Sequence, residues 1–396
     1  MGFVVAFDAL PSLTIGGQRV PSPGQQPLFG DSADYLRMAG HILAGRGPIV
    51  SDGCRLGRMP GYAFFLAAVQ WLFGPRLLAV RLVQAVLATG TVAVAAWLAR
   101  ELFGRREAVW VAVIAAVYPT FILYTGLVLT ETLFALLLLG GLACLLRAVR
   151  RGRAAPAAWA GLLFGLATLV RASFLPGVLV LAVAWVALRP RVCTLAAAAC
   201  LLLAVAATLV PWVARNQIAS SGHVVVTTSR AGASLYEALN PKADGGPMLI
   251  VVTEVPHPPE LDEVERDRQL RALAVRYARE HPGRALWLGL VKFARTWNVV
   301  PNAREFRSPL LAIGLGVPYV LVMLGAALGV WRAGRRGEVA LILLLPVVYY
   351  ALLHTVFVGS IRYRMPVMPL LVALAAHGVC ARGRGQPSRP RSVDGS

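Results

Sequence analysis

Long apolar segments separated by short basic loops account for most of this sequence. Nine such segments follow residue 76, and each is expected to be a helix that crosses a membrane once: 77–99, 108–124, 130–146, 157–170, 173–188, 192–214, 309–331, 339–358 and 365–380. A helix needs about 20 predominantly apolar residues to cross the hydrocarbon core. With a mean hydropathy of +0.66, the pattern predicts an all-α polytopic membrane protein with about nine or ten transmembrane helices.

Two shorter segments near the N-terminus have a different pattern. In 33–43, apolar residues recur at helical spacing, which predicts a short amphipathic helix that begins at Asp31 or Ser32. The segment 61–73 is apolar for 13 residues, too few to span a bilayer. We therefore expect helices that lie in the plane of the membrane surface, joined by a polar loop.

Basic residues in the short loops form five clusters that predict the orientation. They are Arg100, Arg105 and Arg106; Arg147, Arg150, Arg151 and Arg153; Arg189 and Arg191; Arg332, Arg335 and Arg336; and the tail 382–391. All five fall on one side if 61–73 lies in the membrane plane and the other segments cross once. Cytoplasmic loops carry the excess of basic residues, so this side, with the C-terminus, is predicted to be cytoplasmic.

On this basis we divide the chain into six segments. Residues 1–30 are interpreted as the remnant of a first membrane helix followed by an irregular linker, 31–76 as an extracytoplasmic loop with in-plane helices, 77–214 as transmembrane helices, 215–307 as an extracytoplasmic cap with a juxtamembrane helix, 308–380 as the C-terminal transmembrane helices, and 381–396 as a basic cytoplasmic tail. Within the cap, 223–229 has a β-like pattern and 261–279 that of a charged amphipathic helix.

Composition excludes two other classes of protein. The net charge is +20, but the basic residues lie in loops, without the aromatic and basic stripe of a nucleic-acid surface. No nucleic-acid partner is therefore expected. The five cysteines are scattered without a CxxC spacing, which argues against a zinc site or a disulfide framework.

Three acidic residues at the predicted extracytoplasmic face are candidates for chemistry. Asp31 and Asp34 have the positions of a helix cap and a first-turn acid, but a carboxylate at this boundary could also accept a proton from an attacking hydroxyl. Glu131 opens an otherwise apolar segment, where an acid either compensates the helix N-terminus or marks a functional site.

Four arginines are predicted to lie on the same face: Arg58, Arg171, Arg362 and Arg364. Any one of them could simply extend its side chain to the interface. Together they indicate a site for an anion, and at a membrane surface a lipid phosphate is the obvious ligand. Tyr35, Tyr62 and His354 are further candidates, although a histidine inside an apolar segment is more often part of the core.

Several motifs together resemble a known family. GDSADYLRMA at residue 30, RMPGY at 58, YPTFILYTGLVLTETLF at 118, GLATLVRASFLPG at 165 and RYRMPVMPLLVALAA at 362 resemble, in order and topology, the bacterial members of glycosyltransferase family 39. That family includes protein O-mannosyltransferases and the aminoarabinose transferases of lipid A, which share the GT-C membrane fold. The resemblance implies a GT-C-like bundle and a polyprenyl-phosphate sugar as donor.

The resemblance also implies roles for individual residues. Asp31 matches the first acid of the Asp-Glu motif and would be the catalytic base, while Ser32 stands where the second acid would be. Glu131 matches a helix-opening acid that would position the acceptor or the arginines. The remaining matches are basic residues that would stabilise the leaving lipid phosphate in an inverting single displacement: Arg58, Arg171, Arg362 and Arg364.

The sequence is also compatible with other functions. A transporter or lipid flippase would also place charges in a helix bundle, and the departure at Ser32 is compatible with a catalytically degenerate relative. No metal site is indicated, although two carboxylates and a donor phosphate could hold a divalent cation. The expected location is the bacterial inner membrane, with membrane lipid and an extracytoplasmic acceptor as partners.

Overall fold

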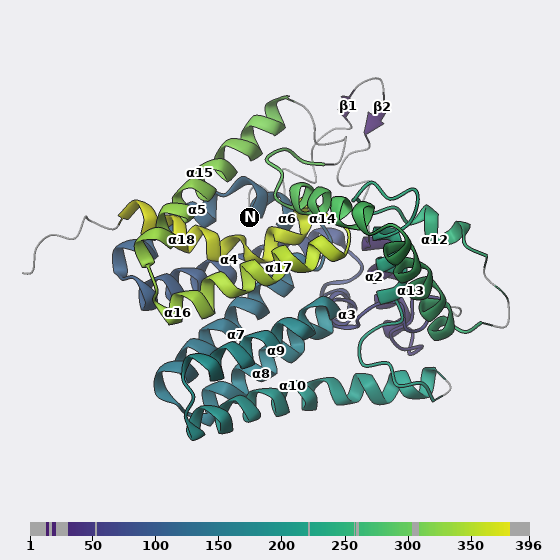
Figure 1. The fold of residues 1–396 in the computed structure, drawn as a ribbon, viewed down its shortest axis with the longest axis horizontal. Helices are drawn as coiled ribbons and strands as arrows, with labels where there is room; N and C mark the ends of the chain where they lie inside the picture. The colour runs from purple at the N-terminus through teal and green to yellow at the C-terminus, as the bar shows by residue number, and fades with distance from the viewer. Residues whose placement is uncertain are drawn as a thin grey trace, which may run out of the picture.

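The structure is a computed structural model of the 396-residue chain, and it describes residues 13–15, 18–20, 31–51, 54–220, 222–256, 258, 261–302 and 309–380. The described residues form a bundle of long helices (Figure 1). One end of the bundle carries short loops between the long helices. The other end carries the short helices of the N-terminal part and of the cap.

All nine apolar segments predicted after residue 76 are helical. Six described helices are long and apolar enough to cross a membrane: α4 (Leu77–Leu102), α7 (Glu131–Arg151), α10 (Val192–Ala219), α15 (Pro309–Ala333), Gly337–Val356 with α16 and α17, and Ile361–Cys380 with η4 and α18. Two shorter apolar helices complete the set, α8 (Ala154–Val170) and α9 (Leu175–Leu188). The predicted all-α polytopic membrane class is confirmed.

The remaining predicted segment, 108–124, is not a straight helix. It consists of α5 (Arg105–Val117) and α6 (Pro119–Gly126), which are bent by 51° relative to each other and make a seventh span if they are counted together. Pro119 has no backbone N–H, and its ring clashes with the preceding turn of an α-helix. Tyr118 accordingly leaves the helical conformation with ψ at 114°.

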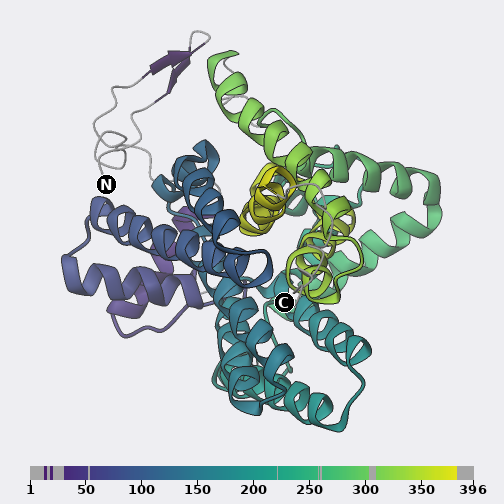
Figure 2. The same cartoon turned by 90° about the vertical axis from the view of Figure 1, so that its left-hand side faces the viewer.

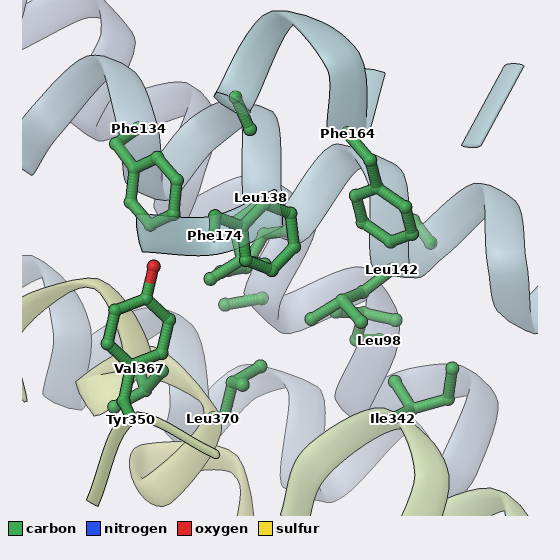
Figure 3. Close-up of a cluster of buried hydrophobic side chains, with 14 of the residues drawn as sticks. Leu98, Phe134, Leu138, Leu142, Phe164, Phe174, Ile342, Tyr350, Val367 and Leu370 are labelled. Carbon is green, nitrogen blue, oxygen red and sulfur yellow. The ribbon is translucent and has the colours of Figure 1, made fainter. Parts of the chain in front are cut away.

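Small residues allow the long helices to approach closely. A Cβ atom on Gly161 of α8 would lie 2.2 Å from the Leu201 carbonyl oxygen of α10, and one on Gly329 of α15 would lie 1.9 Å from the Leu374 carbonyl oxygen of α18. Such contacts are typical of helix packing in membranes. Figure 3 shows the aromatic and aliphatic side chains, Phe134 among them, that fill the centre of the bundle.

The N-terminal part contains the two short helices that were predicted, α2 (Ser32–Leu43) and α3 (Gly61–Phe73). Helix α3 begins against the end of α8, because a Cβ atom on Gly61 would lie only 2.8 Å from the Leu169 carbonyl oxygen. Its other end exposes Trp71, Leu72 and Phe73.

The described part of the cap contains four helices. They are α11 (Ala231–Ala238), α12 (Ile250–Glu254), α13 (Glu263–Glu280) and α14 (Pro282–Thr296). Figure 2 shows α13 and α14 (green) extending to one side of the bundle. Helix α14 is amphipathic, since Trp287 and Leu290 are exposed whereas Leu288 and Lys292 are buried. The charged amphipathic helix predicted at 261–279 is present as α13, which buries Val264 and Leu270.

Two local predictions were wrong. Residues 223–229 form no strand, because the carbonyl groups of Val225 and Thr227 accept hydrogen bonds from the side chains of Asn216 and Trp212 instead of from a second strand. The end of the predicted helix remnant and part of the predicted linker instead form a short antiparallel ladder, β1 (Leu13–Ile15) with β2 (Gln18–Val20). The rest of 1–30, with its predicted membrane helix, and the tail 381–396 lie outside the described residues.

Basic clusters among the described residues meet at the end of the bundle with short loops, which we call the arginine end. Arg150 pairs with Glu101 at 2.8 Å and with Glu338 at 2.9 Å, and Arg189 pairs with Glu338 at 3.1 Å. These pairs connect the ends of α4, α7, α9 and the start of α16. The helix ends that the sequence assigned to one side of the membrane thus lie together.

Candidate functional site

Asp31 lies immediately before α2 at the end of the bundle opposite the arginine end. Its side chain makes no hydrogen bond to the helix N-terminus, so it is not a side-chain cap. Instead, Oδ1 lies 2.7 Å from Arg58 Nη2 and Oδ2 lies 2.9 Å from Arg362 Nη1. The carboxylate is therefore held between two guanidinium groups that are 304 residues apart, from 58 to 362, in the chain.

Glu131 is the first residue of α7 and is only 3% exposed. Arg362 Nε donates a hydrogen bond to Glu131 Oε1, and Arg171 Nη1 lies 3.4 Å from the same oxygen. The Arg171 guanidinium also faces the Tyr363 ring, with Cζ 5.5 Å from the ring centre. Glu131 thus joins a cation from the end of α8 to a cation from η4 (Ile361–Val367).

Asp34 completes the group from the first turn of α2. Its Oδ2 lies 2.8 Å from Arg58 Nη2, and its Oδ1 lies 2.7 Å from the more exposed Arg37. We use the term carboxylate–guanidinium cluster for three acids and three arginines: Asp31, Asp34, Glu131, Arg58, Arg171 and Arg362. Their formal charges balance, and they come from five separate parts of the chain.

The charges of the cluster shift the pKa values of Asp31 and Arg58, which lie outside the membrane-spanning helices. Burial by itself would raise the pKa of the Asp31 carboxyl, but the guanidinium groups of Arg362, Arg58 and Arg230 outweigh it and hold that pKa well below its usual value. Burial by itself would lower the pKa of the Arg58 guanidinium. The neighbouring Asp31 carboxylate raises it, and the resulting pKa lies above the usual value for arginine. Asp31 is therefore ionised in the structure as it stands, and it is a weak base.

The two candidate tyrosines form a wall beside the cluster. Tyr35 and Tyr62 are both buried, and their rings meet edge to face with centroids 5.2 Å apart. The Tyr62 hydroxyl donates to Gln84 Oε1 at 2.6 Å, and Gln84 Nε2 donates to the Thr125 carbonyl at 2.9 Å. This chain of hydrogen bonds fixes α3 against α4 and α6.

Ser32, which stands where the resemblance implied a second acid, makes a hydrogen bond to the backbone of another loop. It is fully buried, and its hydroxyl donates to the Val128 carbonyl at 2.7 Å. That contact attaches the start of α2 to the loop between α6 and α7.

The structure does not bring Arg364 or His354 into the cluster. Arg364 Nη1 donates to the Asn298 carbonyl at 2.7 Å, and its guanidinium lies 3.7 Å from the centre of the Tyr319 ring. His354 stacks on Tyr363 with ring centroids 4.2 Å apart, and its Nδ1 lies 3.2 Å from the Val358 carbonyl oxygen. Its environment is that of a core histidine.

Two cap residues near the cluster were not identified from the sequence. Arg230, before α11, and Glu237, within α11, form an ion pair at 3.4 Å. The Arg230 charge lowers the pKa of Asp31. Burial raises the pKa of Glu237, and Arg230 opposes that effect. Nothing in the local pattern around 230–238 signals this proximity, because it depends on how the cap folds over α2.

A cavity of about 370 Å³ lies beside Glu131, between α4, α5, α6, α7 and the η4–α18 segment. Most of its lining is apolar, including Ala88, Phe121 and Met365, and Glu131 is the only charged residue in it among the described residues. The cluster therefore borders an apolar space inside the bundle. The described residues contain no group of three or more histidine, cysteine or acidic side chains that could hold a metal ion.

Comparison with known proteins supports the resemblance that the sequence motifs indicated. Residues 58–214 match the sequence model of the family described as dolichyl-phosphate-mannose-protein mannosyltransferase. The match covers less than half of the chain and agrees with the resemblance that the motifs indicated. No curated protein sequence matches the chain.

Two solved structures are similar over most of the chain at low sequence identity. One is the archaeal oligosaccharyltransferase AglB from Archaeoglobus fulgidus in complex with an inhibitory peptide and a dolichol-phosphate (16% identity, TM-score 0.49, covering 94% of this chain and 49% of that one). The other is ArnT from Cupriavidus metallidurans bound to undecaprenyl phosphate (15% identity, TM-score 0.43, covering 95% and 75%). The chain thus spans about half the length of the archaeal protein.

Proposed function

We propose that this protein is a membrane glycosyltransferase that transfers a sugar from a polyprenyl-phosphate-linked donor to an extracytoplasmic acceptor by inverting single displacement. The observation that carries the proposal is the carboxylate–guanidinium cluster, whose arginines can bind a phosphate beside an ionised carboxylate. The family match over residues 58–214 supports it independently.

The donor phosphate binds the guanidinium groups of Arg58, Arg171 and Arg362. Arginine binds phosphate through two parallel hydrogen bonds, and these bonds are stronger where water is excluded. At most 16% of each of these three side chains is exposed. Negative charge develops on the phosphate as the bond to the sugar breaks, so the same arginines stabilise the leaving group in the transition state.

Asp31 is the base that takes the proton of the acceptor hydroxyl. In the structure its two oxygens are engaged by Arg58 and Arg362, which keep its pKa low. A donor phosphate that binds these guanidinium groups withdraws them from Asp31. Burial then raises the pKa of the carboxylate and makes it a stronger base. Donor binding and activation of the base are thereby coupled.

Glu131 acts on the arginines rather than on the substrate. It holds Arg362 and Arg171 through a single buried oxygen, Oε1. With this anchor the two cations keep their places while Asp31 changes partners. Tyr35 and Tyr62 close the site on the side of α3.

The orientation and domain roles follow from the two ends of the molecule. Loops rich in arginine lie on the cytoplasmic side of membranes, so the arginine end faces the cytoplasm and the cluster faces outward. The segments 31–76 and 215–307 then form the extracytoplasmic loop and cap around the site. Arg230, at the start of α11, is close enough to Asp31 to lower its pKa, so α11 borders the site and is the part of the cap that we propose the acceptor contacts.

The test is transfer of a labelled sugar by the purified protein in detergent. Synthetic polyprenyl-phosphate hexoses and pentoses serve as donors, and a bacterial envelope extract serves as the acceptor pool. We expect transfer by the wild type and a loss of about 100-fold or more in Asp31→Asn, the range for removal of a general base. Asp244→Asn is the control, because this cap carboxylate is 57% exposed.

Two results would count against the proposal. Full activity in Asp31→Asn would remove Asp31 from the role of base. Absence of transfer from every donor by a folded wild-type protein would refute the glycosyltransferase function itself and leave lipid translocation as the better explanation of the cluster.

A further inference from the structure

Lys292 is a buried cation that the proposed reaction does not use. It lies on the inward face of α14 and is 1% exposed. Its ammonium Nζ donates a hydrogen bond to the backbone carbonyl of Val356 at 2.9 Å. No carboxylate among the described residues pairs with it, in contrast to Lys242, which pairs with Glu254 at the surface.

Val356, whose carbonyl oxygen accepts this hydrogen bond, is the last residue of α17 (Leu345–Val356). The final carbonyl groups of a helix lack partners within the helix and carry partial negative charge. A buried ammonium is costly unless it is compensated. Lys292 and the end of α17 therefore compensate each other, and α14 is attached to the point where α17 stops.

The backbone of Lys292 holds the loop that follows. A Cβ atom on Gly359 would lie 2.3 Å from the Lys292 carbonyl oxygen, so only glycine fits against α14 here. On its other side, the Gly359 N–H donates to the Gly245 carbonyl of the cap at 2.8 Å. The loop 357–360 is thus packed between α14 and the cap.

A second attachment lies just beyond this loop. Arg364 donates to the carbonyl groups of Thr296 and Asn298, at the end of α14 and directly after it. Arg362, which bridges Asp31 and Glu131, lies between Gly359 and Arg364 in the chain. Both flanks of Arg362 are therefore fixed to α14 and the residues after it.

We propose that Lys292 is a positioning residue for Arg362. By holding the end of α17 and the loop 357–360, it aims the Arg362 guanidinium between Asp31 and Glu131. This assignment rests on the proposed function as far as it concerns the reaction. Burial lowers the pKa of Lys292 to about 8, so the ammonium is charged at neutral pH.

The chain contains only two lysines, which provides a matched control. We compare Lys292→Met and Lys292→Arg with Lys242→Met in the sugar-transfer assay. Misplacement of a catalytic contact by about 1 Å costs on the order of 100-fold. We therefore expect Lys292→Met to lose about 100-fold in kcat, with a smaller rise in donor KM because Arg58 and Arg171 still bind phosphate. Lys292→Arg should recover most of the loss, and Lys242→Met should match the wild type.

A purely structural role would give a different result. In that case Lys292→Met would lower the yield and the Tm while kcat per folded molecule stayed at the wild-type level, and the proposal would be overturned. Gly359→Ala serves as a second variant, since it displaces the same loop without removing a charge. It should lower kcat in the same way, and an unaffected kcat would likewise overturn the proposal.

Crystal structures of the wild type and Lys292→Met test the assignment without reference to activity. We expect the variant to show the loop 357–360 displaced and Arg362 separated from Asp31. Retention of both contacts of Arg362 would overturn the positioning role. If the wild type transfers no sugar, the proposed function fails, and this structural comparison still decides the role of Lys292.

Discussion

The two ends of the bundle use the same residue types in different environments. At the arginine end, Arg150 is 34% exposed and its partner Glu101 is 36% exposed. In the carboxylate–guanidinium cluster, Glu131 is 3% exposed and Arg171 is 11% exposed. Both ends join three or more helices through ion pairs, but only the cluster withdraws these charges from water.

This difference in burial distinguishes the exposed loop charges of the arginine end from the buried charges of the candidate site. Exposed ion pairs are screened by solvent and contribute about 0–1 kcal/mol to stability. Buried pairs carry a desolvation penalty, and removal of one partner leaves an uncompensated charge. In the orientation proposed here, the charges of the arginine end lie in cytoplasmic loops and set the topology, whereas those of the cluster bind the donor phosphate in the proposed reaction.

The largest effect is expected from Glu131→Gln, which removes the buried partner of both Arg362 and Arg171. Breaking a buried pair in this way costs about 3–5 kcal/mol. We expect a lower Tm in detergent and, because Arg362 loses one of its two anchors, loss of sugar transfer. Thermal unfolding followed by circular dichroism measures the first effect. A Tm equal to that of the wild type would show that the ion pairs of Glu131 contribute no more to stability than an exposed ion pair does.

A smaller effect, visible in the pH profile, is expected from Arg58→Met. The pKa of Asp31 is lowered in the folded protein, so its ion pairs stabilise the site above the ordinary carboxyl pKa and are lost only as the pH falls through the lowered value. Without Arg58 the pKa of Asp31 rises. The acidic limb of kcat/KM should therefore move to higher pH, since this parameter reports the free enzyme.

The pH experiment has its own internal check. Arg37→Met removes a more exposed cation that pairs with Asp34 Oδ1. It should leave the acidic limb of the kcat/KM profile at its wild-type pH. A limb that stays unchanged in Arg58→Met as well would show that Asp31 is not the group whose protonation stops the reaction.

The smallest effect is expected from Glu338→Gln at the arginine end. This carboxylate pairs with Arg150 and Arg189, which are 34% and 41% exposed. Its removal should change the free energy of unfolding by about 1 kcal/mol or less and leave sugar transfer at the wild-type rate. A strong loss of sugar transfer would mean that the arginine end affects the cluster through the bundle, and that the two ends do not have separate roles.

Much of the fold could be predicted because apolar length and loop charge are local properties. The long apolar segments are helical, with 108–124 divided into two helices, and the loop arginines Arg150 and Arg189 lie together at one end. The strand predicted at 223–229 was wrong for a tertiary reason: side chains of α10 satisfy the carbonyl groups that a neighbouring strand would have used.

The site was predictable in its members but not in its geometry. Asp31, Glu131 and Arg362 are brought together, whereas Arg364 lies elsewhere although it is only two residues from Arg362. Both belong to the 3₁₀-helix η4, which has about three residues per turn, so positions two apart point about 120° away from each other. Arg230 could not be predicted, because its place near Asp31 depends on the docking of the cap.

The balance of three carboxylates and three guanidinium groups in the cluster has a consequence for product release in the proposed reaction. The donor is a phosphodiester with a single negative charge, whereas the lipid product is a phosphomonoester with a charge of about −1.5 to −2 at pH 7. While Asp31 carries the transferred proton, the cluster has a surplus positive charge that retains this product. Once Asp31 gives that proton to water, the cluster is neutral again, and the carboxylate competes with the product for Arg58 and Arg362. Loss of one proton from Asp31 would thus both restore its ion pairs with Arg58 and Arg362 and promote dissociation of the lipid phosphate product.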